Sequence, residues 1–107
     1  MKIGIMINTN EPESAWNALR FANVALSAKH EVEVFLIGRG VELDSVAGGK
    51  FDAKGQLDAF IGAGGKLLAC GTCMKLRGKE SSKTCPLSTL KDLLALVERC
   101  DKLLSFG

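Results

Sequence analysis

Four short apolar runs are separated by stretches long enough to hold helices, and this alternation restricts the fold more than any other feature of the chain. The runs cover residues 2–8, 31–37, 66–70 and 101–106. The first is almost continuously apolar, which is typical of a strand covered on both faces in a parallel sheet. Strands joined by helical crossovers form a right-handed parallel arrangement. We therefore predict an α/β fold: a flavodoxin-like parallel sheet of about four to five strands, in the order 2-1-3-4, with helices on both faces.

Start and stop signals predict the helices between these runs. Asn10 can cap a helix that continues to about residue 28, and Asp52 can cap a second helix that ends near residue 63. A short helical turn is expected over residues 71–77. A final helix should begin after Ser88 or Thr89, with four apolar side chains turned towards the sheet: Leu90, Leu93, Leu94 and Val97.

Length and composition favour one domain, residues 1–107, that is large enough to bury a core. The formal net charge of +2 is too small to indicate nucleic acid, and at 6% aromatic residues the chain has no stacking platform for single strands. No apolar run approaches the roughly 20 residues of a membrane span, and the first residues lack the pattern of a signal peptide. We expect a cytoplasmic protein without nucleic-acid or membrane partners.

The stretch KLLACGTCMKLRGK, residues 66–79, places a thiol where α/β proteins usually carry their chemistry. Cys70 ends the third predicted strand and begins a helical turn. Backbone amides at that turn, with Lys75 and Arg77 nearby, would favour the thiolate, which is the nucleophilic form. In the order 2-1-3-4, the loop after Asn8 flanks the same crevice. Cys70 is therefore a candidate nucleophile, although buried cysteines that only fill space are also common at strand ends.

The other cysteines leave several kinds of site open. Cys73 forms a C-x-x-C pair with Cys70, but a thioredoxin motif would follow the first strand and usually include an aromatic residue and a proline. Together with Cys85 these thiols could begin a metal site, yet a closed zinc site needs four ligands and only Cys100 and the distant His30 remain. We expect no metal. Cys100 is predicted to be a core thiol, whereas Cys85 could approach Cys70 or lie exposed.

Cofactor motifs are absent from the sequence. The first loop, NTNEPE, is acidic and has no glycine, which argues against both a P-loop and a dinucleotide fingerprint. The lone histidine precedes the second strand, so no Ser/His/Asp set is available at the carboxyl edge. We expect no cofactor.

Two motifs resemble the DsrE/DsrF family, which includes the TusD-type sulfur-relay subunits: LLACGTC followed by RG, and the ending DKLLSFG. The similarity covers essentially the whole chain. It implies a single DsrE/DsrF-like domain in which Cys70 accepts sulfane sulfur as a persulfide and passes it to a partner thiol. It also implies a homo-oligomer, a trimer or hexamer, and protein sulfur donors and acceptors.

Cys73 departs from the TusD-type pattern, which has a small non-thiol residue there. A persulfide on Cys70 could be attacked by Cys73, which would release sulfide and leave a disulfide. Three hypotheses therefore remain: a sulfurtransferase-type carrier with Cys70 and Cys73 as its catalytic residues, a non-catalytic oligomeric or metal-binding module, and a Cys70/Cys73 dithiol–disulfide switch. Three apolar residues outside the predicted core stripes suggest a contact surface: Trp16, Phe21 and Met74.

Overall fold

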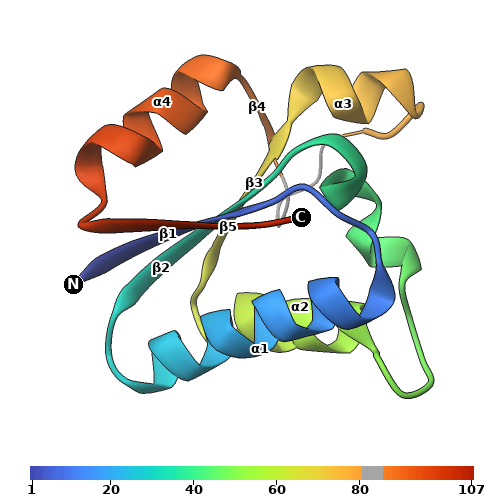
Figure 1. Ribbon diagram of the computed structural model, residues 1–107. Helices are drawn as coiled ribbons and strands as arrows, with labels where there is room; N and C mark the ends of the chain where they lie inside the picture. The colour runs from blue at the N-terminus through green and yellow to red at the C-terminus, as the bar shows by residue number, and fades with distance from the viewer. Residues whose placement is uncertain (81–85) are drawn as a thin grey trace.

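The computed structural model describes residues 1–80 and 86–107, and within them five parallel strands form one sheet between two layers of helices (Figure 1). Helices α1 and α2 lie on one face of the sheet, and α3 and α4 lie on the other side. The prediction of an α/β parallel sheet, consistent with a flavodoxin-like fold, is confirmed. The elements in chain order are β1 (Lys2–Ile7), α1 (Pro12–Ser27), β2 (Glu31–Leu36), the 3₁₀ segment η1 (Gly38–Ser45), α2 (Ala53–Gly62), β3 (Lys66–Cys70), α3 (Gly71–Leu76), β4 (Leu87–Ser88), α4 (Leu90–Arg99) and β5 (Lys102–Phe106).

The strand order differs from the prediction. The observed order is β4-β3-β2-β1-β5, so β3 pairs with β2, and β1 lies between β2 and β5. Because crossovers are right-handed, two helices on the same face carry the chain in the same direction across the sheet. Helices α1 and α2 share a face, where the Asn23 amide donates to the backbone and side-chain oxygens of Gln56. The order 2-1-3-4 would have required these helices on opposite faces and is wrong.

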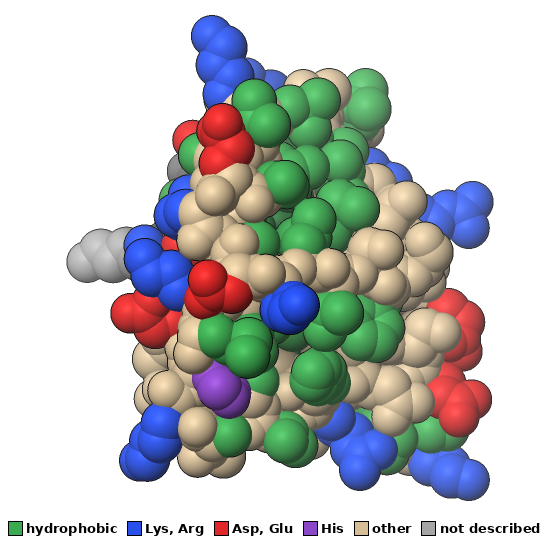
Figure 2. All heavy atoms as spheres, turned by 60° about the vertical axis from the view of Figure 1, so that its left-hand side comes forward, with side chains coloured by type: hydrophobic (Ala, Val, Ile, Leu, Met, Phe, Trp, Pro, Cys, Tyr) green, Lys and Arg blue, Asp and Glu red, His purple; other side chains and the backbone are tan. Residues whose placement is uncertain are grey.

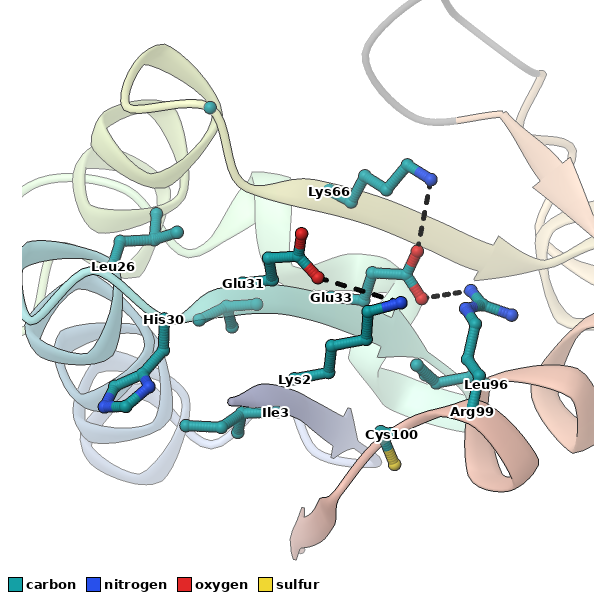
Figure 3. Close-up of a pocket in the computed structure, with 12 residues that line it drawn as sticks. Lys2, Ile3, Leu26, His30, Glu31, Glu33, Lys66, Leu96, Arg99 and Cys100 are labelled. Carbon is teal, nitrogen blue, oxygen red and sulfur yellow. Dashed lines mark hydrogen bonds and ion pairs between the residues drawn. The ribbon is translucent and has the colours of Figure 1, made fainter.

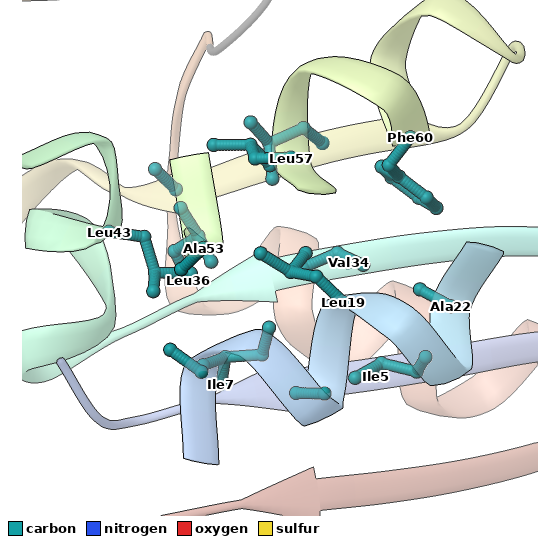
Figure 4. Packing of buried hydrophobic residues seen from close by; sticks show 14 of the residues in the cluster. Ile5, Ile7, Leu19, Ala22, Val34, Leu36, Leu43, Ala53, Leu57 and Phe60 are labelled. Carbon is teal, nitrogen blue, oxygen red and sulfur yellow. The ribbon is translucent and has the colours of Figure 1, made fainter. Parts of the chain in front are cut away.

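The main core lies between the sheet and the α1–α2 layer (Figure 4). Ile5, Ile7 and Val34 point from the strands towards the fully buried Leu19 of α1 and Phe60 of α2. Burying one such side chain completely contributes roughly 1.5–3 kcal/mol. Small residues on α1 let this helix approach the sheet closely: Ala15, Ala18, Ala22 and Ala25.

The predicted caps are partly confirmed. Asp52 accepts a hydrogen bond from the Gly55 N–H at the start of α2, and Thr89 forms a capping box at the start of α4. Helix α1 begins differently, because the carboxylate of Glu11, not Asn10, accepts two N–H groups of the first turn. These hydrogen bonds, led by that from the Ser14 N–H, hold the pKa of Glu11 below its ordinary value.

Helix α4 presents a different side to the sheet from the one predicted. Leu96 is its buried residue, and Leu93 and Cys100 pack partly against the second core cluster, which includes Phe35 of β2. Three of the four predicted inward residues are exposed: Leu90, Leu94 and Val97. Apolar residues occupy more than one stripe of this helix, so their spacing alone did not determine which stripe packs on the sheet.

The predicted contact surface is also different. Met74 is buried, and Trp16 is half-buried against Phe51, with ring centroids 5.2 Å apart. Of the three predicted residues only Phe21 is exposed, at 37%. Exposed apolar side chains gather instead on α4 and β5. No helix among the described residues is long and apolar enough to cross a membrane.

Candidate functional site

The C-x-x-C pair lies at the carboxyl edge of the sheet, where β3 ends and α3 begins. Cys70 is the last residue of β3 and is only 5% exposed, in the cluster that also contains Phe35 and Leu96. Cys73 follows within the first turn of α3, is half-buried, and contacts both core clusters. Both sulfurs are free thiols. The two cysteines therefore combine a protected thiol with a more accessible one.

The turn after β2 supplies a hydrogen bond to the second thiol. The Gly38 N–H donates to Cys73 Sγ at 3.2 Å. An N–H group directed at sulfur stabilises negative charge on that atom. Gly38 has φ +57°, a backbone conformation that favours glycine, and a Cβ at this position would lie 2.2 Å from Oδ1 of the exposed Asn8 side chain, which would have to turn aside.

Sequence reasoning did not identify this contribution of Gly38. The available signal was the Gly38-Arg39-Gly40 stretch that directly follows the second apolar run. Gly40 also permits a close backbone approach, since a Cβ there would lie 2.0 Å from the Ile7 carbonyl oxygen. The turn is thus packed tightly against the end of β1 and is held in position beside Cys73.

The cations after the cysteines pair with carboxylates of η1. Arg77 Nε lies 2.5 Å from Glu42 Oε2, and Lys79 Nζ lies 2.5 Å from Asp44 Oδ1. The hydrogen bond from Arg77 holds the pKa of Glu42 below its ordinary value. Arg77 also donates to the Cys73 carbonyl at 3.0 Å. These two cations therefore join the end of α3 to η1, whereas Lys75 is exposed and forms no ion pair with a described residue.

The remaining candidate ligands do not gather around this pair. Within residues 1–80 and 86–107, no three His, Cys, Asp or Glu side chains are placed to hold a metal ion. Cys100 is half-buried at the end of α4, and His30 lies at the amino edge, where its Nδ1 is 2.8 Å from the terminal amino group. Cys85 lies outside the described residues, so its two predicted positions stay predictions.

A pocket of about 460 Å³ lies at the opposite end of the strands (Figure 3). Its apolar floor includes Ile3 and Leu96. On its rim, Glu33 lies between Arg99 and Lys66, with the Lys66 nitrogen 3.3 Å from the carboxylate. The pocket is lined by Cys100 but by neither Cys70 nor Cys73, so it is separate from the C-x-x-C pair.

Comparisons with known proteins identify the family of this chain. The model of the DsrE/DsrF-like family matches residues 1–106. The uncharacterized protein MJ0989 of Methanocaldococcus jannaschii is 34% identical over 99% of this chain and all of its own length. The uncharacterized protein MK0008 of Methanopyrus kandleri is 34% identical over 88% of this chain and 83% of its own. With its α/β sheet and its thiols at the carboxyl edge, the chain belongs to the DsrE/DsrF-like family.

Proposed function

We propose that this protein is a sulfur carrier that holds sulfane sulfur as a persulfide on Cys70 and passes it to a thiol of a partner protein. The family suggests a sulfur-relay role in general. The observation that carries the specific proposal is the pair of free thiols at the carboxyl edge, one protected and one half-buried. A protected sulfur atom is suited to holding a persulfide, because small thiols in solution readily remove the terminal sulfur of an exposed persulfide.

The transfer needs no oxidant or reductant. The Cys70 thiolate attacks the outer sulfur of a donor persulfide, an S–S bond to Cys70 forms, and the donor leaves as its thiolate. An acceptor thiolate then attacks the same outer sulfur, and Cys70 is released as a thiolate. Each step exchanges one S–S bond for another by thiol–disulfide chemistry.

Cys73 provides a second possible reaction for the persulfide on Cys70. The Cys73 thiolate, whose sulfur accepts a hydrogen bond from the Gly38 N–H, can attack the inner sulfur of the Cys70 persulfide. This step forms a Cys70–Cys73 disulfide and expels hydrosulfide, and a dithiol reductant must then restore both thiols. The acceptor thiol and Cys73 therefore compete for the loaded state, and removal of Cys73 should prolong its lifetime.

Intact mass spectrometry tests the loading step. Reduced protein is incubated with a sulfane-sulfur donor, and we expect a gain of about 32 Da per sulfur atom bound as persulfide. Cys70→Ser should abolish the gain, whereas Cys73→Ser should retain it for longer than the wild type. Cys100→Ser is the matched control and should load normally. The proposal is refuted if the wild type gains no sulfur under conditions that load a known carrier.

A dithiol–disulfide switch is the second candidate, and the position of Cys73 three residues after Cys70 favours it. Side chains at this spacing at a helix start are about 5–6 Å apart at Cβ, so a modest shift can bring the two sulfurs together. A reduction potential within the cytosolic glutathione range would support a switch. A potential far outside that range, together with stable sulfur loading, would favour the carrier.

The proposed partners follow from the same chemistry. Sulfur would arrive from and leave to cysteine-bearing proteins, and the carrier would be a homo-oligomer, a trimer or hexamer. A reducing compartment such as the cytoplasm suits free thiols, and three of the four cysteines are described as free. We propose the cytoplasm as its location and residues 1–107 as one DsrE/DsrF-like domain.

A further inference from the structure

Helix α4 exposes an apolar stripe that no described residue covers. Leu90, Leu94 and Val97 are 61%, 58% and 43% exposed. Figure 2 shows hydrophobic side chains gathered in the upper half of this face, over α4. Spacings of four and three residues align these side chains along one flank of the helix. A continuous stripe of this kind marks an interaction surface more often than scattered single residues do.

The stripe faces the edge of the sheet formed by β5. Arg99, about half a turn around the helix from Leu90, reaches back to pair with Glu33 on β2. The flank that carries the stripe is therefore turned away from β2, towards β5. Leu103 of β5 continues the apolar surface, because it is 39% exposed and lies beside Leu96 and Cys100 above Gly4.

Strand β5 also leaves one side of its backbone available. It lies at the end of the strand order, and among the described strands it pairs only with β1. Its residues are exposed except the last, Phe106, which is half-buried. An exposed edge strand with apolar side chains is a template for pairing with another chain. The edge of β5 and the α4 stripe thus form one surface, which we call the α4–β5 face.

We infer that the α4–β5 face binds a second copy of this chain across a two-fold axis. Antiparallel pairing of the two β5 edges would continue the sheet, and it would place the two α4 helices side by side in opposite directions on one face of it. The contact would extend along roughly 15 Å of helix and roughly 17 Å of strand. An isologous contact of this kind uses the same patch on both copies.

The charges beside the stripe are complementary in this arrangement. Lys91 and Glu98 lie on the same outer flank of α4, seven residues or about two turns apart. With the axis near Leu94, Lys91 of one copy faces Glu98 of the second copy, and this pairing occurs twice. Neither residue has an ion pair among the described residues. Parallel helices would instead bring like charges together, so the charges favour the antiparallel contact.

Light scattering after size exclusion tests the face with two matched valine variants. We expect an even-numbered assembly for the wild type, and half its mass for Val97→Glu. Val24→Glu is the control, because Val24 is also exposed, at 66%, but lies on α1. Circular dichroism verifies that each variant folds. The inference is overturned if the wild type is a monomer or a trimer, or if Val97→Glu assembles like the wild type.

Charge reversal tests the antiparallel direction. Lys91→Glu and Glu98→Lys alone should each weaken association about tenfold, or about 1.4 kcal/mol. The double variant should restore it, because the two charges are only exchanged. A double variant no tighter than either single variant contradicts this direction of packing.

Of the two assemblies in the proposed function, the two-fold contact fits the hexamer, as two trimers joined in pairs, and does not fit a trimer. The inference does not depend on the cysteine chemistry. The same variants are therefore also assayed for sulfur loading. If Val97→Glu dissociates and still loads sulfur, both proposals hold. Loss of loading in Cys70→Ser with an unchanged assembly tests the carrier alone.

Discussion

Replacement of Gly38 by alanine tests the turn that donates a hydrogen bond to Cys73. A left-handed backbone costs an alanine about 1–2 kcal/mol, and Gly38 has φ +57°. The new Cβ would also lie 2.2 Å from Asn8 Oδ1. Asn8 is exposed, so its side chain can turn away from the methyl group, and holding a side chain off its preferred rotamer costs about 0.5–1.5 kcal/mol. We expect the free energy of unfolding to fall by about 1.5–3.5 kcal/mol in total.

Two further variants separate these costs. Gly48 has φ +77°, but a Cβ there meets nothing within 4 Å, so Gly48→Ala should show only the backbone cost of about 1–2 kcal/mol. Adding Asn8→Ala to Gly38→Ala removes the oxygen that the methyl group meets. The double variant should therefore recover the part of the loss that arises from the clash.

Urea unfolding followed by circular dichroism measures these differences. The rate of alkylation of Cys73, resolved by mass spectrometry, should also differ between Gly38→Ala and the wild type, because a displaced turn no longer directs its N–H at the sulfur. The reasoning fails if Gly38→Ala is as stable as Gly48→Ala, or if Asn8→Ala restores nothing.

Three other predictions concern stability. Phe60→Ala should lower the free energy of unfolding by about 3–5 kcal/mol in urea titrations, because Phe60 is fully buried. Thr89→Ala should lower it by about 1 kcal/mol and fray α4, seen as lost helical signal. Glu11 and Glu42 have lowered pKa values in the folded state. Their stabilisation is complete at neutral pH and is lost as the pH falls from the ordinary carboxyl range through the lowered values. Urea midpoints at pH 7 and pH 3 should therefore differ more in the wild type than in Glu11→Gln or Glu42→Gln.

The sequence was sufficient for the fold class because apolar runs and helix caps are local signals. No local signal determines the strand order. The order depends on α1 and α2 sharing a face, as the contact between Asn23 and Gln56 shows. Similarly, α4 carries apolar residues on more than one stripe, and only packing against Phe35 and its neighbours makes Leu96 the buried one.

In the candidate site, too, local features were predictable from the sequence and contacts between distant segments were not. The positions of Cys70 and Cys73 followed from the end of an apolar run and were predicted correctly. The donor to Cys73 was not predicted, because a backbone N–H carries no side-chain signature and Gly38 lies 35 residues away. The pairing of Arg77 with Glu42 was missed for the same reason, since the carboxylate belongs to a segment just as distant.

The place of β1 between β2 and β5 has a consequence for the order of folding. Its pairing with β2 needs only the α1 connection, whereas Lys2 meets Asp101, next to β5, across 99 residues. Closing the longer loop is slower, so β1 should acquire its second neighbour late, together with the docking of α4. Until β5 pairs with it, the buried strand β1 has an edge with unpaired backbone groups. We therefore expect aggregation during refolding to begin at β1, and amide exchange there to become protected in two stages.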